Sequence, residues 1–327
     1  MSAPSLDIRI TDADIEDSLR ADVLTGLSSS PKTLPPKWFY DARGSELFTD
    51  ITALAEYYPT RTERSLLERH AGDIAAAADA ETIVELGSGS SEKTRVLLRA
   101  AVDQGALNTY VPQDVSESAL AQAVTELQTE FPTLRVHGIV SDFTHAIPAL
   151  PHSGRRMIAF LGGTLGNLNP VERAEFLGAL AGSLDDGGTL LLGVGLVTDV
   201  DVMEAAYDDA DGVTAAFDKN VLTVLNGRLG ANFDLDDFEH VAVWNPEDEW
   251  IEMRLRARRD LTVRVDDLDI DVPFSAGESI RTEISAKFRR DGITTELATA
   301  GFRVADFWTD PRERFGLILA ARDQRSH

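Results

Sequence analysis

The segment from Thr82 to Thr94 holds the residues whose types and spacing point most directly to chemistry. A short apolar run at 83–86 is typical of a buried strand, and helical spacing resumes over 93–101. Between the two, Gly87 and Gly89 allow the backbone to turn tightly and to approach a ligand closely. The segment therefore predicts a strand, a ligand-cradling turn and a helix.

Two familiar nucleotide motifs do not match this segment. A dinucleotide fingerprint needs a third glycine at position 92, and a phosphate-binding P-loop needs a glycine directly before Lys93, but Glu92 stands there. An acidic side chain is unfavourable beside phosphate and compatible with a cationic cofactor. A loop of the form E-x-G-x-G ahead of a helix is typical of S-adenosylmethionine binding, although Gly-Ser turns of this kind also occur without a ligand.

Acidic residues follow the next two predicted strands. The strand over 108–114 ends in Asp114, at the place where α/β nucleotide folds put the acid that binds ribose hydroxyls. The strand over 134–140 leads to Asp142, which can accept from an adenine amino group, and to Phe143, which can contact the base. Asp142 taken alone could equally cap a helix or a turn. The succession of these strand ends favours a nucleotide-type cofactor.

Composition excludes several classes of protein. The chain has 327 residues, of which 43% are hydrophobic, enough for one large core or two modest ones. A net charge of −24 disfavours nucleic acid and anionic membranes as partners, and a small-molecule substrate fits better. The absence of cysteine excludes disulfides and thiolate metal sites. The six histidines are scattered, which favours surface or core roles over metal ligation, and no apolar stretch is long enough to span a membrane.

Strand and helix signals alternate through the middle of the chain, as in a doubly wound α/β sheet. A strand over 156–161 is followed by Gly162 and Asn167, and another strand is expected over 189–194. Ligands in open α/β sheets bind at the carboxyl ends of the strands. Gly162 and Asn167 are therefore expected where substrate meets cofactor.

After Val197 this alternation stops. A helical stretch over 199–214 is followed by strand patterns at 238–243, 250–259 and 261–265, then by a helix over 285–300 and two closing strands at 301–308 and 315–321. The closing pair is similar to the terminal hairpin of S-adenosylmethionine methyltransferases. We predict an α/β fold: a Rossmann-like class I methyltransferase core of residues 60–197 plus 286–327, and a strand-containing α+β substrate domain of residues 1–59 plus 198–285. The acceptor is expected in a cleft between them.

Over nearly its whole length the chain resembles the histidine Nα-methyltransferases of ergothioneine biosynthesis. The resemblance is carried by five segments: Pro36-Lys37-Trp38-Phe39-Tyr40-Asp41, Glu56-Tyr57-Tyr58-Pro59-Thr60-Arg61, Glu85-Leu86-Gly87-Ser88-Gly89-Ser90, Leu161-Gly162-Gly163-Thr164-Leu165-Gly166-Asn167 and Arg281-Thr282-Glu283-Ile284-Ser285. Together these segments are far more specific than a cofactor loop alone. The resemblance implies an enzyme that trimethylates the α-amine of free L-histidine to hercynine and releases S-adenosylhomocysteine.

The resemblance also implies a role for individual residues. Tyr57 and Tyr207 would hold the substrate carboxylate, and Asn167 would hold the α-amine. Glu283 and Ser285 would hold the imidazole, and Met253 would form a wall of the side-chain pocket. The cofactor site would be lined by Tyr40, Gly87, Lys93, Asp114, Asp142 and Phe143. No metal is implied, and we expect a cytoplasmic monomer that binds neither nucleic acid nor membrane.

The residue chemistry agrees with a substrate that has two polar ring atoms. Glu283 and Ser285 are two positions apart, so an extended backbone turns a carboxylate and a hydroxyl to one face. A hydrophobic slot discriminates by only about 1–3 kcal/mol, whereas an unmatched buried hydrogen-bonding pair costs a wrong substrate far more. Without the resemblance, Glu283 could be a solvated strand acid and Tyr207 a packing residue.

The mechanism expected is in-line displacement by the neutral α-amine on the sulfonium methyl, so the main task of the enzyme is positioning. The amine must lose a proton before each transfer, and the acceptor is either water or Tyr40. Three rounds of methylation need room near Gly162. Phe48 or Phe39 could face the methylated cation.

Three other functions remain open on the residues alone. A methyltransferase of another amino acid or small amine would keep the cofactor, but a buried Glu283 would serve an apolar substrate poorly. A nucleotide-binding interaction module is favoured only by the net charge, which more often serves solubility. An NAD-linked dehydrogenase is least favoured because of Glu92.

Overall fold

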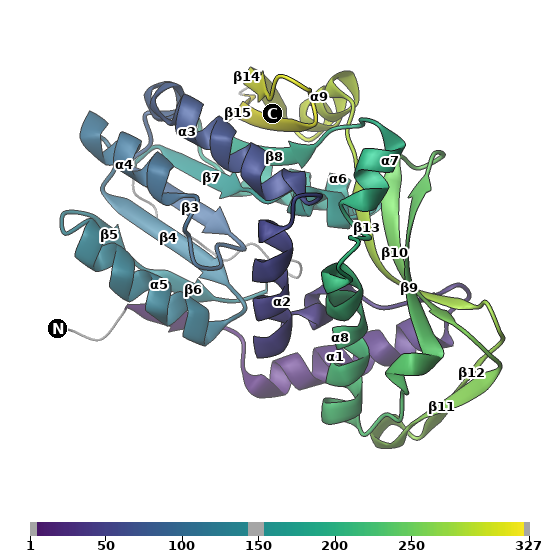
Figure 1. Ribbon diagram of the computed structural model, residues 1–327. Helices are drawn as coiled ribbons and strands as arrows, with labels where there is room; N and C mark the ends of the chain where they lie inside the picture. Colours follow the sequence, from purple (N-terminus) through teal and green to yellow (C-terminus); the bar gives the residue numbers. More distant parts are fainter. Residues whose placement is uncertain (1–4, 143–153, 324–327) are drawn as a thin grey trace. The chain divides into compact units, whose positions relative to one another are not determined.

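The computed structural model describes residues 5–142 and 154–323, and the chain divides into two compact units (Figure 1). The first unit contains Met1–Thr11, Arg61–Val197 and Phe288–His327, and the second contains Asp12–Thr60 and Thr198–Lys287. Each unit is therefore assembled from separate stretches of the chain.

A nine-stranded sheet forms the centre of the first unit within the described residues. Its order is β1-β6-β4-β3-β7-β8-β15-β14, with β5 beside β4. All pairings are parallel except those that β15 makes with β8 and with β14. The fold is α/β and Rossmann-like, as predicted. The strands are β1 Leu6–Ile8, β3 Thr82–Leu86, β4 Thr109–Asp114, β5 Arg135–Val136, β6 Gly138–Val140, β7 Arg156–Phe160, β8 Thr189–Gly195, β14 Phe302–Thr309 and β15 Phe315–Arg322.

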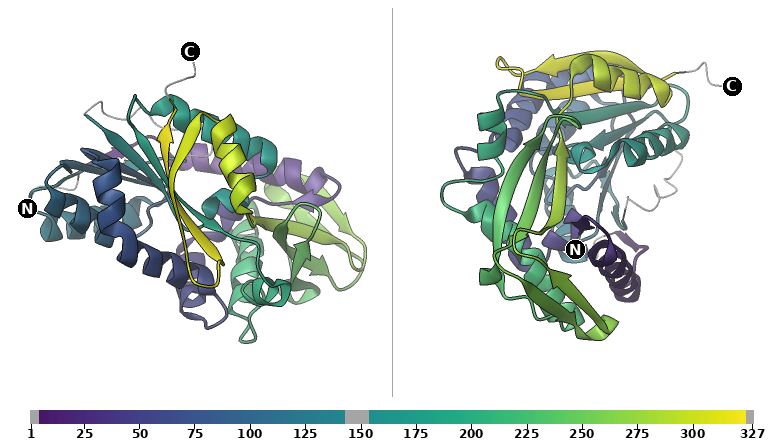
Figure 2. Two further views of the ribbon diagram at one scale, coloured as in Figure 1. Left: turned by 90° about the horizontal axis from the view of Figure 1, so that it is seen from above. Right: turned by 90° about the vertical axis from the view of Figure 1, so that its right-hand side faces the viewer.

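Helices cover this sheet on both faces, which is why β3, β7 and β8 are buried along their whole length. In Figure 1, α3, α4 and α5 lie in front of the strands, and the left view of Figure 2 shows α6 and α9 on the side away from α3. The N-terminus of α6 is specified by a capping box between Asn169 and Glu172. The helices are α3 Tyr58–Ala78, α4 Arg95–Gln104, α5 Glu117–Glu130, α6 Pro170–Ser183 and α9 Arg290–Thr299, with a short 3₁₀ turn, η2, at Thr164–Asn167.

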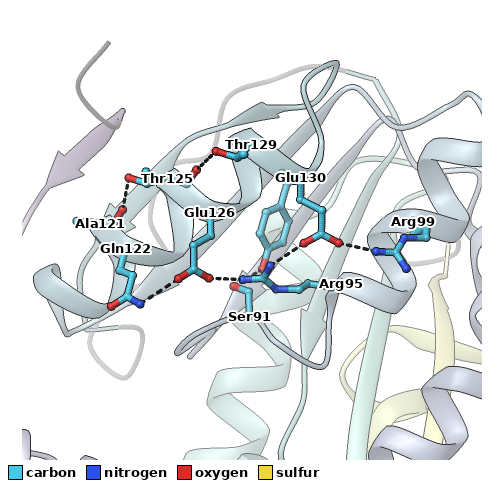
Figure 3. Close-up of polar contacts among 10 residues, drawn as sticks. Ser91, Arg95, Arg99, Ala121, Gln122, Thr125, Glu126, Thr129 and Glu130 are labelled. Atoms are coloured by element: carbon cyan, nitrogen blue, oxygen red, sulfur yellow. Dashed lines mark hydrogen bonds and ion pairs between the residues drawn. The ribbon is translucent and has the colours of Figure 1, made fainter. Parts of the chain in front are cut away.

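Ion pairs join α4 to α5 on the surface of the first unit (Figure 3). Arg95 contacts Glu126 and Glu130 at 2.6 Å each, and Arg99 contacts the second oxygen of Glu130 at 2.6 Å. Two carboxylates shared by two guanidinium groups form a network, which stabilises more than isolated surface pairs do. The network lies over the start of α4, directly after the glycine-containing loop.

The second unit is built on a smaller sheet with the order β2-β13-β10-β9. Its apolar core is separate from that of the first unit and includes Phe217, Phe238 and Met253. The strands are β2 Lys32–Thr33, β9 Phe238–Asn245, β10 Trp250–Ala257 and β13 Ser279–Ala286, with a separate hairpin of β11 Leu261–Val265 and β12 Ile270–Phe274. The helices are α1 Asp12–Ser28, α2 Ala42–Ala53, α7 Val200–Ala205 and α8 Val213–Leu229, and the 3₁₀ turns are η1 Pro36–Phe39, η3 Leu235–Asp237 and η4 Asp266–Leu268.

A buried polar network supports the bulge between β10 and β13. The register changes after Met253, which leaves Thr282 without a partner residue across the ladder. The Thr282 hydroxyl donates to Asp218 on α8 at 2.5 Å, and the other oxygen of Asp218 is 2.6 Å from His240 Nδ1. His240 Nε2 lies 2.8 Å from the backbone carbonyl of Tyr207. Burial lowers the pKa of His240, but the contact with Asp218 raises it above its usual value, and both partners can accept, so the surroundings favour the imidazolium form.

The structure differs from the sequence-based expectations at three places. The helix expected from Ser285 begins only at Arg290, because β13 continues its ladder with β10 to Ala286. The helical stretch over 199–214 is two elements, since α7 ends at Ala205 and α8 begins at Val213 after Gly212, whose φ is 73°. Residues 1–11, which we placed with the second domain, group with the first unit because β1 pairs with β6.

We predict that Thr282→Val destabilises the protein by about 2 kcal/mol. The substitution keeps the shape of the side chain but removes a hydroxyl donor from a carboxylate that is 0% exposed, and a hydrogen bond to a charged group contributes about 1.5–3 kcal/mol. Urea denaturation measures the change. Thr295→Val, at an exposed hydroxyl that bonds only within α9, is the control and should stay within about 0.5 kcal/mol. Equal effects of the two substitutions would contradict the role of the network.

Candidate active site

The loop after β3 is held by Asp114 at the end of the neighbouring strand β4. The Gly89 N–H donates to Asp114 Oδ2 at 2.8 Å, and the Ser116 N–H donates to Oδ1 at 3.0 Å. Gly87 and Gly89 have φ values of 64° and 52°, a region that favours glycine. A Cβ on Gly89 would meet no atom within 4 Å, so the backbone there faces open space.

These features fit the cofactor expected from the sequence. Each oxygen of the half-buried Asp114 carboxylate accepts one backbone hydrogen bond and keeps a lone pair for a ribose hydroxyl. The open space beside Gly89 allows the close backbone approach that an adenosyl group needs. Asp142 directly follows Ser141 after β6, and its side chain is half-buried; Phe143 lies outside the described residues.

A buried carboxyl group lies beneath the same loop. Glu85 on β3 is 1% exposed, accepts from the Thr94 hydroxyl at 2.6 Å and is hydrogen-bonded to the Tyr110 hydroxyl. Tyr110 in turn lies 2.9 Å from the hydroxyl of Ser91. Burial raises the pKa of Glu85 to about 7, although the hydrogen bonds from Thr94 and Tyr110 oppose this rise. The network joins the strand to the middle of the loop at Ser91 and to its end at Thr94, and so restrains the loop's conformation.

A second buried carboxylate, Glu63 on α3, joins two of the expected site residues. One oxygen accepts from Lys93 Nζ at 2.6 Å, and the other accepts from the Gly162 N–H at 2.7 Å. Glu63 is 0% exposed. A Cβ at position 193 would stand 2.0 Å from Oε1 of this carboxylate, so a side chain on the facing part of β8 would displace Glu63 from its present position. Glu63 therefore positions Lys93 against the end of β7.

Asn167 closes the η2 turn that follows β7. Gly162 and Gly163 both have positive φ values, 86° and 72°, and they reverse the chain directly after the strand. The Asn167 side chain is half-buried at the end of this turn. The first unit thus joins Lys93 to Gly162 through Glu63, and it joins the loop after β3 to Asp114 through the Gly89 N–H.

The residues expected to bind the side chain of the substrate lie on one face of the second sheet. Met253 on β10 is directly opposite Glu283 on β13, and Ile251 is directly opposite Ser285. Residues opposite each other, and residues two apart, share a face, so Met253, Glu283 and Ser285 form one surface. Met253 is 2% exposed and Ser285 is 6% exposed, whereas Glu283 is half-buried.

Tyr207 reaches this surface from the end of α7. Its hydroxyl lies 2.7 Å from Ser285 Oγ, and Lys287 Nζ donates to Tyr207 and to Ser285 at 2.8 Å and 2.7 Å. Burial raises the pKa of Tyr207 and Glu283 raises it further, so this phenol stays protonated and acts as a donor. Its hydroxyl thus contacts Ser285 and Lys287, and its assignment to the substrate carboxylate stays a prediction.

Aromatic rings connect the remaining expected residues of the second unit. Ring centroids are 5.6 Å apart for Tyr40 and Phe48, 6.3 Å for Phe48 and Tyr57, and 6.1 Å for Tyr57 and Tyr207. Tyr40 is 46% exposed, whereas Tyr57 is 9% exposed. Phe39 is 0% exposed and packs on Phe217, so it cannot face a methylated cation, while the half-buried Phe48 still can.

Sequence reasoning missed Glu63 and Lys287, although each leaves a trace in the pattern. Glu63 falls on the same helical stripe as Leu67 and Ile74, where an acid is unexpected. Lys287 continues the alternation of Glu283 and Ser285. Among the described residues no group of three or more histidine or acidic side chains is arranged to hold a metal ion.

We predict that Glu63→Gln weakens S-adenosylmethionine binding about tenfold. The amide keeps one accepting oxygen but turns an NH₂ group toward Lys93 or Gly162, where both neighbours donate, and leaving one such bond unmade costs about 1–3 kcal/mol. Calorimetric titration measures the affinity. Glu68→Gln on the exposed side of the same helix is the matched control and should bind normally. Unchanged binding by Glu63→Gln would contradict the positioning role.

A pH-dependent prediction follows from Glu85. Its folded-state pKa lies above the value of 4.5 expected for the unfolded chain, so its contribution to stability is present below pH 4.5 and is lost as the pH rises toward about 7. The free energy of unfolding of the wild type minus that of Glu85→Gln should fall by about 1.4 kcal/mol per pH unit in this window and level off above it. Urea denaturation between pH 4.5 and pH 8.5 tests this. A difference that rises with pH would mean that Glu85 is held as a carboxylate.

Comparison with known proteins finds relatives that match nearly the whole chain. A histidine N-alpha-methyltransferase of Mycolicibacterium smegmatis is 53% identical over 306 residues, which cover 94% of this chain and 95% of the relative. A histidine N-alpha-methyltransferase of Mycobacterium tuberculosis is 50% identical over 305 residues and covers 93% and 95% of the two chains. An L-tryptophan methyltransferase of Psilocybe serbica is 28% identical and covers 96% of each chain.

The sequence profile of one family matches nearly the whole chain. The family is described as "Histidine-specific methyltransferase, SAM-dependent", and the match runs over residues 19–322. It therefore includes the loop after β3, the η2 turn and the surface of β13. By this match, and by its similarity to the two mycobacterial enzymes, the chain belongs to the family of histidine-specific, S-adenosylmethionine-dependent methyltransferases.

Proposed function

We propose that the protein transfers methyl groups from S-adenosylmethionine to the α-amine of free L-histidine until it is trimethylated to hercynine, the first step of ergothioneine biosynthesis. The observation that carries the proposal is the face of β13 where Glu283 and Ser285 lie together, opposite Met253 and Ile251. A carboxylate and a hydroxyl on one otherwise apolar face suit an imidazole ring, which has two polar atoms and an apolar remainder. The family and the two mycobacterial relatives support the same reaction.

In this proposal the first unit binds the cofactor. Asp114 accepts from the ribose hydroxyls, the Gly87–Gly89 backbone lies against the adenosyl group, and Lys93 completes the site from the start of the helix that follows. Asp142 and Phe143 bind the adenine base. S-adenosylmethionine supplies an electrophilic methyl group on a positively charged sulfur. Because that activation belongs to the cofactor, the chain's own contribution is to hold the reactants in position.

The second unit, together with Asn167, binds histidine in this proposal. Glu283 accepts the N–H of the imidazole, Ser285 meets the second ring nitrogen, and Met253 packs against the ring. Tyr57 and Tyr207 hold the carboxylate. Asn167 orients the α-amine, and its flexible amide can both donate to and accept from that nitrogen as the number of methyl groups changes.

Each transfer requires a neutral amine, so a proton must leave before the nitrogen attacks. Tyr40 in its phenolate form could take this proton, and because Tyr40 is 46% exposed the proton can then pass to solvent. We propose Tyr40 as a catalytic residue on this ground, with water as the other acceptor. Gly162, which carries no side chain, leaves room for the growing ammonium, and the ring of Phe48 can stabilise the cation.

The surroundings of the reaction are also part of the proposal. We propose a cytoplasmic monomer that acts on a free amino acid and binds neither nucleic acid nor membrane, in keeping with the net charge of −24. Within the described part of the chain, no helix is both long and apolar enough to cross a membrane.

A second candidate is a methyltransferase of another amino acid. The 28% identical relative from Psilocybe serbica, named as an L-tryptophan methyltransferase, favours this reading, since it matches the chain over almost its full length. Glu283 distinguishes the two candidates. The Glu283 carboxylate suits a ring with two nitrogens. A mostly apolar ring would leave at least part of the hydrogen-bonding capacity of the carboxylate unused.

We predict that histidine alone gains three methyl groups when the enzyme is mixed with S-adenosylmethionine and all twenty free amino acids. Glu283→Ala should lower kcat/KM for histidine at least ~100-fold, because the ring N–H then loses its acceptor. Mass spectrometry reads the products, and Glu247→Gln in an exposed turn serves as the control variant.

The outcomes separate the two candidates. Methylation of a different amino acid would exclude the histidine reaction but keep the methyltransferase. Histidine methylation that survives in Glu283→Ala would remove the imidazole assignment and leave the reaction in place. No product from any amino acid, by a protein that still binds S-adenosylmethionine, would exclude a free amino acid as the acceptor.

A further inference from the structure

His240 on β9 is a buried histidine that the proposed reaction has not yet used. Its side chain is 1% exposed, and each ring nitrogen has a partner. Nδ1 lies 2.6 Å from Asp218 Oδ2, and Nε2 lies 2.8 Å from the backbone carbonyl of Tyr207. A carbonyl oxygen only accepts, so Nε2 carries a proton and donates to it, whatever the protonation of Nδ1. His240 therefore fixes the backbone of a residue that is proposed to bind the substrate.

Asp218 on α8 keeps the ring in this orientation. Its carboxylate is 0% exposed, and its second oxygen accepts from the hydroxyl of Thr282 at 2.5 Å. One buried carboxylate thus joins α8, the ring of His240 and the bulge of β13. A ring that is hydrogen-bonded through both nitrogens cannot rotate without breaking a bond, and an unmade hydrogen bond is costly in a buried site.

The second sheet relates His240 to the imidazole end of the proposed site. His240 and Ala242 are two positions apart on β9, so their side chains share a face. Ala242 is directly opposite Met253 on β10, and Met253 is directly opposite Glu283 on β13. The donor to Tyr207 and the proposed imidazole ligand therefore stand on one face of one hydrogen-bonded sheet.

Tyr207 is held at both its hydroxyl and its backbone. The hydroxyl contacts Ser285 and Lys287, and the carbonyl accepts from His240. In the proposed function the hydroxyl also binds the substrate carboxylate, so its contacts must change when the substrate enters. The bond from His240 to the carbonyl requires no such change. It ties Tyr207 to the sheet independently of the ligand.

We propose that His240 is a specificity-determining positioning residue that holds Tyr207 at a set distance from Glu283, and that this spacing selects the length of the substrate side chain. The inference rests on the proposed function, in which Tyr207 binds the carboxylate and Glu283 the imidazole. A side chain that is longer by one methylene would leave one of these two contacts unmade. His240 acts through Tyr207 and does not itself touch the substrate.

The test compares L-histidine with L-homohistidine, whose side chain is longer by one methylene. The value of kcat/KM is measured for each amino acid with the full chain and saturating S-adenosylmethionine, and the two values are expressed as a ratio. One methylene is discriminated by about 10–200-fold in a fitted pocket, so the wild type should prefer histidine at least about tenfold. A smaller fraction of folded enzyme lowers both values equally and leaves the ratio unchanged.

Two substitutions of His240 separate its two hydrogen bonds. The amide nitrogen of asparagine is as many bonds from Cα as Nδ1 of histidine, and that of glutamine is as many as Nε2. His240→Gln can therefore keep the bond to Tyr207, whereas His240→Asn keeps only the contact with Asp218. We expect the ratio to fall at least about fivefold in His240→Asn, as for one lost hydrogen bond, and to stay within about twofold of the wild type in His240→Gln.

Further variants keep the comparison decisive. His240→Leu fills the same space but donates to neither partner, and it should lower the ratio as His240→Asn does. His70→Asn, at a half-buried position on α3, is the matched control and should keep the wild-type ratio. Calorimetric titration with S-adenosylhomocysteine shows that each variant is folded.

An unchanged ratio in His240→Asn and His240→Leu would overturn the inference. Equal losses in His240→Asn and His240→Gln would overturn it too, because a purely structural role of the ring does not separate its two nitrogens. A wild type that methylates both amino acids equally well would mean that the site does not select side-chain length. These three results leave the proposed function intact, since histidine is still trimethylated. A wild type that does not methylate histidine would remove the proposed function and this inference with it.

Discussion

The geometry of the proposed cofactor site depends on one buried carboxylate. Glu63 is 0% exposed and accepts from Lys93 and from the Gly162 N–H, so one side chain connects α3, the loop just before α4 and the end of β7. A buried charge of this kind stabilises only when each oxygen has a partner, and here each has one. The close approach of β8 is part of the same constraint, because a side chain at Gly193 would collide with Glu63.

The two units use buried polar groups in a similar way. In the first unit, Glu85 joins β3 to the loop that follows it. In the second unit, His240 joins Asp218 to the backbone of Tyr207. Such groups are costly unless every hydrogen bond is made, so they favour one arrangement over its alternatives. Lys287 extends the principle to the second sheet, where its buried ammonium donates to Tyr207 and to Ser285.

Much of the fold could be predicted from local pattern. Apolar runs that end in glycine or an acid located β3 and β4, and period-two alternation located β9 to β11. The pattern was wrong at Ser285, because the residues of β13 are held in a strand by pairing with β10 rather than by their own preference. It also could not show that β1 pairs with β6, since that contact joins residues more than a hundred positions apart.

The sequence by itself determined the alternation of strands and helices in the middle of the chain, the cofactor class and, through the family resemblance, the residues expected at the site. It placed Glu283 and Ser285 on one face because alternation along a strand is a local property. Only the tertiary structure decided which buried groups hold those residues. Glu63 and Lys287 act through partners that come from other elements, such as Gly162 and Tyr207. Hydrogen bonds between distant segments leave no periodic signal, so the polarity of the site emerges only when the chain is folded.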